Sequence, residues 1–259
     1  MLRLKFAGKW RRRVNFLILV FLVLWLLPLL GSIATFAGGN ADWRTAPRHS
    51  SGIAPDPRMT PQAVVQVYSA RAFSWRGAFG VHTWVAVKRS GAARFTVYEV
   101  VGWRAYRGRS ALVSSVRAPD GLWFGNQPDI IADIRGDGVD KIISRIESAV
   151  RDYPYAHAYR LWPGPNSNTF TAYIGRVVPE LQLDLPPTAI GKDFLPGGAL
   201  AASTPSGTGY QVSVLGLAGL AVALEEGLEL NLLGLTFGVD INRPAIKLPG
   251  FGRIGVGPS

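Results

Sequence analysis

The 259-residue sequence contains no cysteine and few charged residues. Without cysteine the chain forms neither a disulfide nor a thiolate metal site, so its fold is indifferent to an oxidising compartment such as the periplasm. It also lacks a Walker-type phosphate loop, a His-x-x-x-His pair and clustered acids at calcium-loop spacing. We therefore expect no dedicated cofactor and no metal.

Charged residues make up 17% of the sequence, against 48% hydrophobic residues and eight tryptophans. This composition is typical of a folded protein rather than of a disordered chain. The formal net charge is +11, but six of the 28 basic residues precede the first acid, namely Arg3, Lys5, Lys9, Arg11, Arg12 and Arg13. Because this basic run adjoins a hydrophobic segment, it indicates membrane topology, and we expect no nucleic-acid partner.

A long uncharged segment lies between Arg13 and Asp42. Residues 14–36 are numerous and apolar enough to cross a bilayer as one helix. Basic residues before the segment place the N-terminus in the cytoplasm by the positive-inside rule. We predict a single-pass anchor in the inner (cytoplasmic) membrane, with residues 1–13 cytoplasmic and the body in the periplasm or outside the cell.

A cleaved signal peptide is the alternative, because Thr35-Phe36-Ala37 offers small residues where a signal peptidase acts. The apolar stretch is longer than that of most signal peptides, which favours an uncleaved anchor. Residues 37–61 are rich in Gly, Ser, Pro and Asn without apolar periodicity, and predict a linker between membrane and body.

Residues 62–259 are expected to form a single α+β domain. Alternation of period two predicts a strand from residue 63 and an antiparallel hairpin over residues 79–101. Apolar residues at helical spacing predict a helix that follows Asp137, a candidate N-cap. A second helix is predicted to begin near Ser167 or Asn168 and to end before Pro179.

The part of the chain from about residue 210 is punctuated by glycine and predicts mostly strands. Within it, Gly216–Leu224 is an apolar run. This run is too short to bridge a bilayer as a helix, so we expect packed core there instead.

The sequence Trp162-Pro-Gly-Pro-Asn-Ser-Asn-Thr-Phe170 places a hydroxyl, that of Ser167, at the start of a predicted helix. Residues 166–170 resemble the Asn-Cys-x-x-Phe motif of circularly permuted papain-like proteins, the lecithin retinol acyltransferase and NlpC/P60 relatives. In those relatives the cysteine is the nucleophile, and a strand with the catalytic histidine precedes it, as His82 precedes Ser167 here. The resemblance covers about residues 63–180 and implies an antiparallel sheet with packed helices in a permuted papain-like core.

Three segments also resemble an uncharacterised bacterial family, domain-of-unknown-function family 3750. They are the Pro163–Phe170 run, Ala189-Ile-Gly-Lys-Asp-Phe194 and the stretch Leu228–Val239. This resemblance spans nearly the whole chain and implies no activity.

Ser167 departs from the papain pattern at the attacking atom, because a hydroxyl is much harder to ionise than a thiol. It can attack an acyl carbon if His82 accepts its proton, a third group fixes the imidazole tautomer and amides at the helix start bind the oxyanion. Glu99 is the candidate for the third role. Strand register decides whether Glu99 or Tyr98 shares the face of His82.

The same residues also have a structural interpretation, in which Asn166 and Ser167 cap the helix and His82 is an ordinary sheet histidine. If they line a cleft instead, its binding residues are expected to be Asn166, Asn168, Trp84 and Tyr98. His157 could reach the same cleft, although a surface position is favoured.

Basic residues outnumber the single acid, Glu99, between residues 71 and 109. They are Arg71, Arg76, Lys88, Arg89, Arg94, Arg104, Arg107 and Arg109. A solvated basic face is favoured, and a surface for an anionic ligand or lipid headgroup is the alternative.

Two functions follow from the sequence. In the first, a membrane-anchored envelope protein uses a cleft to bind a lipid, a peptide or a cell-wall fragment, or scaffolds a partner. In the second, Ser167, His82 and Glu99 form the catalytic group of a hydrolase or acyltransferase that acts on an acyl or peptide-type bond. The lipid bilayer is the expected partner in both.

Overall fold

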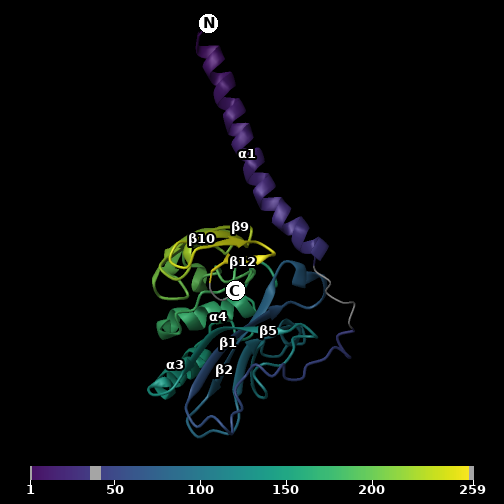
Figure 1. Cartoon of the computed structure of the whole chain (residues 1–259), viewed down its shortest axis with the longest axis vertical. Coiled ribbons are helices and arrows are strands. Elements are labelled where there is room, and N and C mark those ends of the chain that lie inside the picture. The colour runs from purple at the N-terminus through teal and green to yellow at the C-terminus, as the bar shows by residue number, and fades with distance from the viewer. Residues whose placement is uncertain (1, 36–41, 257–259) are drawn as a thin grey trace.

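The computed structural model describes residues 2–35 and 42–256, and within the first range the side chains of residues 11–16, 19, 23 and 26–34. Phe36 and linker residues 37–41, which belong to the predicted anchor boundary and linker, lie outside the described residues. Helix α1 (Leu2–Thr35) projects from one end of the body (Figure 1). In the part of the chain that the structure describes, no helix combines the length and the apolar character needed to cross a membrane.

The body contains two antiparallel sheets and a few helices, which confirms the α+β class. The first sheet has the order β4-β3-β2-β1-β5. Its strands are β1 (Val64–Arg71), β2 (Val81–Lys88), β3 (Thr96–Val100), β4 (Leu112–Val116) and β5 (Pro128–Arg135). The predicted first strand and the β2–β3 hairpin are confirmed. Two short helices, η1 (Ser74–Ala78) and α2 (Gly102–Ala105), follow β1 and β3.

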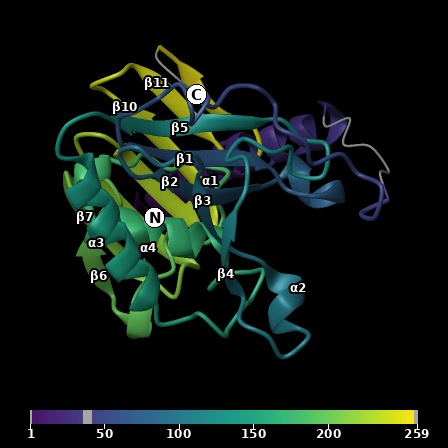
Figure 2. The same ribbon diagram turned by 90° about the horizontal axis from the view of Figure 1, so that it is seen from below.

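Helices α3 (Val139–Arg151) and α4 (Ser167–Val177) cover one face of this sheet, as Figure 2 shows from below. Their apolar stripes meet the sheet in a core that includes Val65, Val85, Ile143, Ile146 and Phe170. Both helices lie where helical spacing predicted them. The N-cap of α3 is Gly138 in the left-handed region, φ 83°, and not Asp137, because the chain turns sharply just before the helix.

Residues 50–54, within the segment predicted as a linker, lie against the other face of the sheet. The Asp120 carboxylate accepts hydrogen bonds from the Ser50 hydroxyl (2.8 Å) and from the Ile53 and Ala54 amides (2.9 and 3.2 Å). Ile53 packs against a second apolar cluster on this face. Strand β1 is consequently buried on both sides.

The second sheet is a seven-stranded meander in chain order, β6 to β12. Its strands are β6 (Ala201–Ser203), β7 (Gly209–Val214), β8 (Ala218–Ala223), β9 (Gly227–Leu232), β10 (Leu235–Asp240), β11 (Ala245–Leu248) and β12 (Gly252–Gly255). Short helices η2 (Pro179–Leu181) and η3 (Pro196–Gly198) lead from α4 to it. The predicted strand-rich C-terminal part is confirmed.

This sheet is polar on the side that faces the body. Glu229 contacts Lys192 at 2.5 Å and Lys247 at 2.8 Å, and Lys247 also contacts Asp184 at 2.7 Å. Burial by itself raises the pKa of Glu229, but the two lysines outweigh burial and lower it, so the carboxylate stays ionised. Asn231 donates a hydrogen bond of 2.5 Å to Asp193 in the same layer.

The prediction that Gly216–Leu224 is packed core is wrong. Leu220 and Val222 of β8 are 44% and 58% exposed. The reason lies in the period-two alternation of the strands: the inward positions of this sheet carry the buried polar network, so the apolar positions point outward.

Replacing Glu229 by Ala should leave the buried Lys192 ammonium without its carboxylate partner and Lys247 with Asp184 alone. We expect this change to destabilise the full chain by about 3–5 kcal/mol. Glu147→Ala is the matched control, since Glu147 pairs with Arg89 at the surface, where an ion pair contributes under about 1 kcal/mol. Urea unfolding of the detergent-solubilised protein measures both changes. Equal losses in the two variants would contradict the structural role of the network.

Candidate functional site

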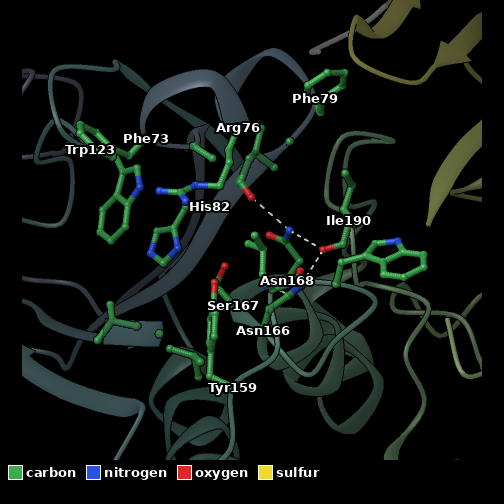
Figure 3. Close-up of a pocket in the computed structure, with 18 of the residues that line it drawn as sticks. Phe73, Arg76, Phe79, His82, Trp123, Tyr159, Asn166, Ser167, Asn168 and Ile190 are labelled. Carbon is green, nitrogen blue, oxygen red and sulfur yellow. Dashed lines mark hydrogen bonds between the residues drawn. The ribbon is translucent and has the colours of Figure 1, made fainter. Parts of the chain in front are cut away.

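A cavity of about 710 Å³ opens between the two sheets. Its wall is rich in aromatic side chains, which include Phe73, Phe79, Trp103, Trp123, Tyr159 and Trp162. His82 of β2 and the first residues of α4 face the same space (Figure 3). Leu29 of α1 and Leu233 and Leu235 at the β9–β10 turn complete the lining. The pocket is therefore built from α1, the first sheet, α4 and the second sheet together.

Strand register places Glu99 on the same face as His82. Val85 pairs with Tyr98 and Ala86 with Val97, so residues with even numbers in β2 share a face with odd-numbered residues in β3. His82 Nε2 lies 3.1 Å from Glu99 Oε2. Tyr98 lies on the opposite face, in the core beneath the helices, which corrects its predicted place in the cleft.

Aromatic rings enclose the imidazole. Trp123 stacks on His82 with 3.6 Å between ring centroids and 10° between planes. Trp84, which was predicted to line the cleft, is fully buried behind His82 instead, stacked on Tyr68 and donating its Nε1–H to the Pro119 carbonyl at 2.7 Å. Its role is to support the histidine rather than to contact a ligand.

The charges around His82 define its tautomer. Burial lowers the pKa of His82, and Glu99 opposes this effect only in part. Burial would raise the pKa of Glu99, but the hydrogen bond with His82 and the positive charge and hydrogen bond of Arg117 outweigh burial and lower it. Arg117 Nη2 lies 3.1 Å from Glu99 Oε1. A neutral His82 beside an ionised Glu99 donates its Nε2–H to the carboxylate. The lone pair is then on Nδ1, the nitrogen that can accept a proton.

Ser167 is the first residue of α4 and is 5% exposed. Asn166, not Ser167, caps the helix, through a capping box with Thr169. Among the described residues, the Ser167 hydroxyl has no hydrogen-bond partner, and it is not hydrogen-bonded to His82. Figure 3 shows the Ser167 side chain and the His82 ring facing the same part of the pocket. The capping interpretation thus accounts for Asn166 but not for Ser167.

The amide groups at the start of α4 leave one free donor. The amides of Asn168 and Thr169 donate to Asn166 Oδ1 at 2.9 and 3.1 Å, and that of Phe170 donates to the Asn166 carbonyl. The Ser167 N–H has no partner within the described part of the chain. It is therefore the amide that is available to bind an oxyanion at the positive end of the helix.

Asn168 holds three parts of the molecule together. Its Nδ2 donates to the Val81 carbonyl of β2 at 3.0 Å and to the Ile190 carbonyl at 2.8 Å, while its Oδ1 accepts from Thr83 at 3.0 Å. Asn166 Nδ2 also donates to the Ile190 carbonyl at 3.0 Å, and Figure 3 shows the two bonds from Asn166 and Asn168 to Ile190. We call Asn166, Asn168, Thr83 and Ile190 the asparagine clamp. Asn166 and Asn168 line the pocket, but the side-chain amides of both residues are already hydrogen-bonded within the clamp.

Two further predicted groups are separate from this centre. His157 is exposed and lies away from the pocket wall. Of the basic residues, Arg76 and Arg107 line the pocket, whereas Arg89 pairs with Glu147 and Lys88 is buried against the Gln62 carbonyl at 2.8 Å.

Several residues of the site were not predicted from the sequence. Arg48, Trp123 and Arg117 lie in segments without periodicity, so no local pattern marked them. Tyr159 also lines the pocket, and burial raises its pKa to about 12, which keeps its hydroxyl protonated as a donor. Within the described residues, no group of three or more His, Asp or Glu side chains is placed to hold a metal ion.

Residues 62–194 match the model of a family described as protein of unknown function (DUF3750). The match covers more than half of the chain and includes His82, Glu99, Ser167 and the asparagine clamp. It ends at Phe194, before the second sheet, so the stretch Leu228–Val239 is not part of it. Neither a curated protein nor a solved structure matches the chain.

Replacing Asn168 by Asp keeps the size and the acceptor but removes two donors to backbone carbonyls. We expect the full chain to lose about 2–4 kcal/mol of unfolding free energy, because buried carbonyls would then face a carboxylate. The exposed Asn242→Asp is the matched control, with little expected change. Chemical denaturation measures both; a neutral effect of Asn168→Asp would contradict the clamp.

Proposed function

The chain belongs to the DUF3750 family of proteins of unknown function, and we propose that it is a membrane-anchored envelope protein that binds an amphiphilic acyl compound and cleaves or transfers its acyl group through Ser167. One observation carries this proposal. A buried His82–Glu99–Arg117 chain, set in the tautomer of a general base, shares an aromatic pocket with an uncommitted serine hydroxyl at a helix N-terminus.

The proposed reaction begins when Ser167 Oγ attacks the acyl carbon and His82 Nδ1 takes the hydroxyl proton. Glu99 stabilises the imidazolium, and the Ser167 N–H donates to the oxyanion. Collapse breaks the bond to the leaving group, which receives the proton from His82. Water then attacks the acyl-serine with His82 again as base, which releases the acid and restores Ser167; an alcohol or amine in place of water gives transfer.

The pocket wall favours an apolar acyl chain over a polar peptide or sugar fragment. Aromatic and aliphatic side chains dominate it, and the described lining residues include no carboxylate. Arg48, Arg76 and Arg107 are the cationic members of the wall. An amphiphile with an uncharged chain and a neutral or anionic head matches this arrangement better than a cationic ligand.

The membrane-anchor part of the proposal rests on the sequence and on α1. The basic residues before the apolar segment favour a cytoplasmic N-terminus, so the body is proposed to lie in the periplasm or outside the cell. Described side chains of the segment such as Phe16, Leu19 and Leu27 are 64%, 58% and 59% exposed on α1. The order of the histidine strand and the serine helix supports a permuted papain-like core.

A second candidate is a pocket that binds the same amphiphile without cleaving it. It is favoured by one observation, namely that Ser167 and His82 are not hydrogen-bonded to each other in the described structure. In this case Ser167 contacts the ligand and the His82–Glu99 pair is a buried structural element.

A fluorophosphonate probe should label the full chain at Ser167 if the hydroxyl is activated. We expect Ser167→Ala and His82→Ala to abolish labelling, while the exposed Ser114→Ala labels as the parent protein does. Peptide mapping by mass spectrometry identifies the labelled residue. If the folded parent protein is not labelled, the proposed enzyme activity is contradicted and the second candidate, binding without cleavage, takes its place.

The labelling rate should also depend on pH through His82. The base must be neutral, and its pKa is lowered below 6.5, so the rate should rise with pH below 6.5 and be constant above it. In the Glu99→Gln variant the side-chain amide can donate a hydrogen bond to His82 Nε2, which favours the tautomer with the proton on Nδ1. Because Nδ1 then cannot act as the base, the labelling rate should fall by about two to four powers of ten. A rate that is unchanged in Glu99→Gln would exclude Glu99 from the mechanism.

A further inference from the structure

The outer face of the seven-stranded sheet, turned away from the body, is built without charge. One cross-strand row runs through six consecutive strands by direct pairing, and its members are 43–80% exposed. The row is Tyr210, Val222, Leu228, Val239, Ile246 and Ile254. A neighbouring row contains Val212, Leu220, Leu230 and Phe237. We call the two rows together the outer face.

The apolar character continues into the turns that border the outer face. Leu215, Leu224, Leu233 and Ile241 occupy these turns and are 51–83% exposed. A contiguous apolar surface of this extent is rare on a monomeric protein in water and marks an interaction surface. Because the polar network occupies the inner face, the outer face cannot be buried by the body itself.

The C-terminal part of α1 contacts the turn between β11 and β12. The Ser32 hydroxyl lies within hydrogen-bonding reach of the Ala78 carbonyl and, at 3.0 Å, of the Gly250 carbonyl beside β12. Arg71 donates to the same Gly250 carbonyl at 2.7 Å. Gly31 lies so close to Phe251 that a Cβ at this position would meet the ring at 2.7 Å. These contacts fix the helix next to the β11–β12 turn.

Helix and sheet occupy the same end of the molecule. Figure 1 shows α1 projecting beyond β9, β10 and β12, and Figure 2, seen along the long axis from below, shows β10 and β11 behind the first sheet. The outer face is therefore turned toward the side on which α1 extends. We propose that it rests on the surface of the lipid bilayer that α1 enters, with its side chains inserted among the acyl chains next to the headgroups.

A lipid surface suits the outer face better than a second copy of the chain. If two copies stacked their outer faces, their α1 helices would extend in opposite directions and could not enter one membrane from the same side. This step rests on the anchor of the proposed function. In addition, the interior of the sheet satisfies its backbone hydrogen bonds by strand pairing, so insertion exposes mainly side chains to lipid. Tyr210, at one end of the row, has the amphipathic ring typical of a membrane interface.

Docking would also connect the bilayer with the pocket. Leu235 pairs with Leu232 on the outer side of the sheet, and both Leu235 and Leu233 line the pocket. Leu29 of α1 lines it as well. An amphiphile could pass from the bilayer along these leucines without its acyl chain entering water.

The test uses the full chain in phosphatidylcholine–phosphatidylglycerol vesicles. Because the sequence has no cysteine, single substitutions Val222→Cys and Ile246→Cys each carry one environment-sensitive fluorophore on the outer face. Ala93→Cys, in the exposed β2–β3 turn, is the water-exposed control, and Leu19→Cys reports on α1. Quenching by spin-labelled lipids is compared among the four. We expect quenching at 222 and 246 to exceed that at 93 several-fold.

Position 19 separates this inference from the anchor. Suppose that the label at position 19 is quenched, while the labels at positions 222 and 246 are quenched no more than the control at position 93. The anchor then stands and the docking proposal is wrong. If the label at position 19 is not quenched, the anchor fails. Docking of the outer face is then still decided by whether quenching at positions 222 and 246 exceeds that at position 93. The unlabelled Val222→Cys variant also tests for a second copy of the chain. Efficient disulfide cross-linking between two copies, together with no lipid quenching of the labelled variant, would assign the outer face to a second copy and overturn the proposal.

Discussion

The asparagine clamp is the constraint on which the rest of the site depends. By donating to Val81 and Ile190 and accepting from Thr83, Asn168 fixes the start of α4 against the histidine strand and against the loop that leads to the second sheet. The position of Ser167 opposite His82 follows from this arrangement. Two residues after Ile190, Lys192 enters the ion network beneath the second sheet. One amide side chain therefore couples the nucleophile candidate to both halves of the body.

The second sheet has polar side chains on its inner face and apolar side chains on its outer face, the opposite of most sheets in soluble proteins. Lys192, Glu229 and Lys247 are buried on its inner face and the outer face is apolar. A buried network of this kind is weak evidence for stability, but it specifies which face of the sheet meets the body. This choice has a functional consequence, since it turns a flat apolar surface toward the side on which α1 extends. Leu29 of α1 and Leu233 and Leu235 of the second sheet line the pocket, and in the proposed arrangement they connect it with the bilayer.

Local patterns predicted the β2–β3 hairpin, both long helices and the C-terminal strands, because strand and helix periodicity depends on residues that are close in the sequence. Long-range contacts were not predictable in this way. The docking of residues 50–54 onto the first sheet depends on Asp120, which is far along the chain. Glu99 was a candidate for the group that orients His82, but the sequence left Tyr98 as the alternative on that face. The observed register of β2 and β3 excluded Tyr98. Gly216–Leu224 was assigned to the core because its composition is apolar, whereas strand alternation and the buried charges send its side chains outward.

The central claim is that the aromatic pocket holds the acyl chain of a membrane amphiphile beside Ser167. The most direct measurement is photo-crosslinking of the full chain in vesicles with a phospholipid that carries a diazirine in its acyl chain, followed by peptide mapping. If the pocket holds the acyl chain, adducts should form on pocket residues such as Phe79, Trp162 and Leu235. Adducts on α1 alone, with none in the pocket, would contradict it.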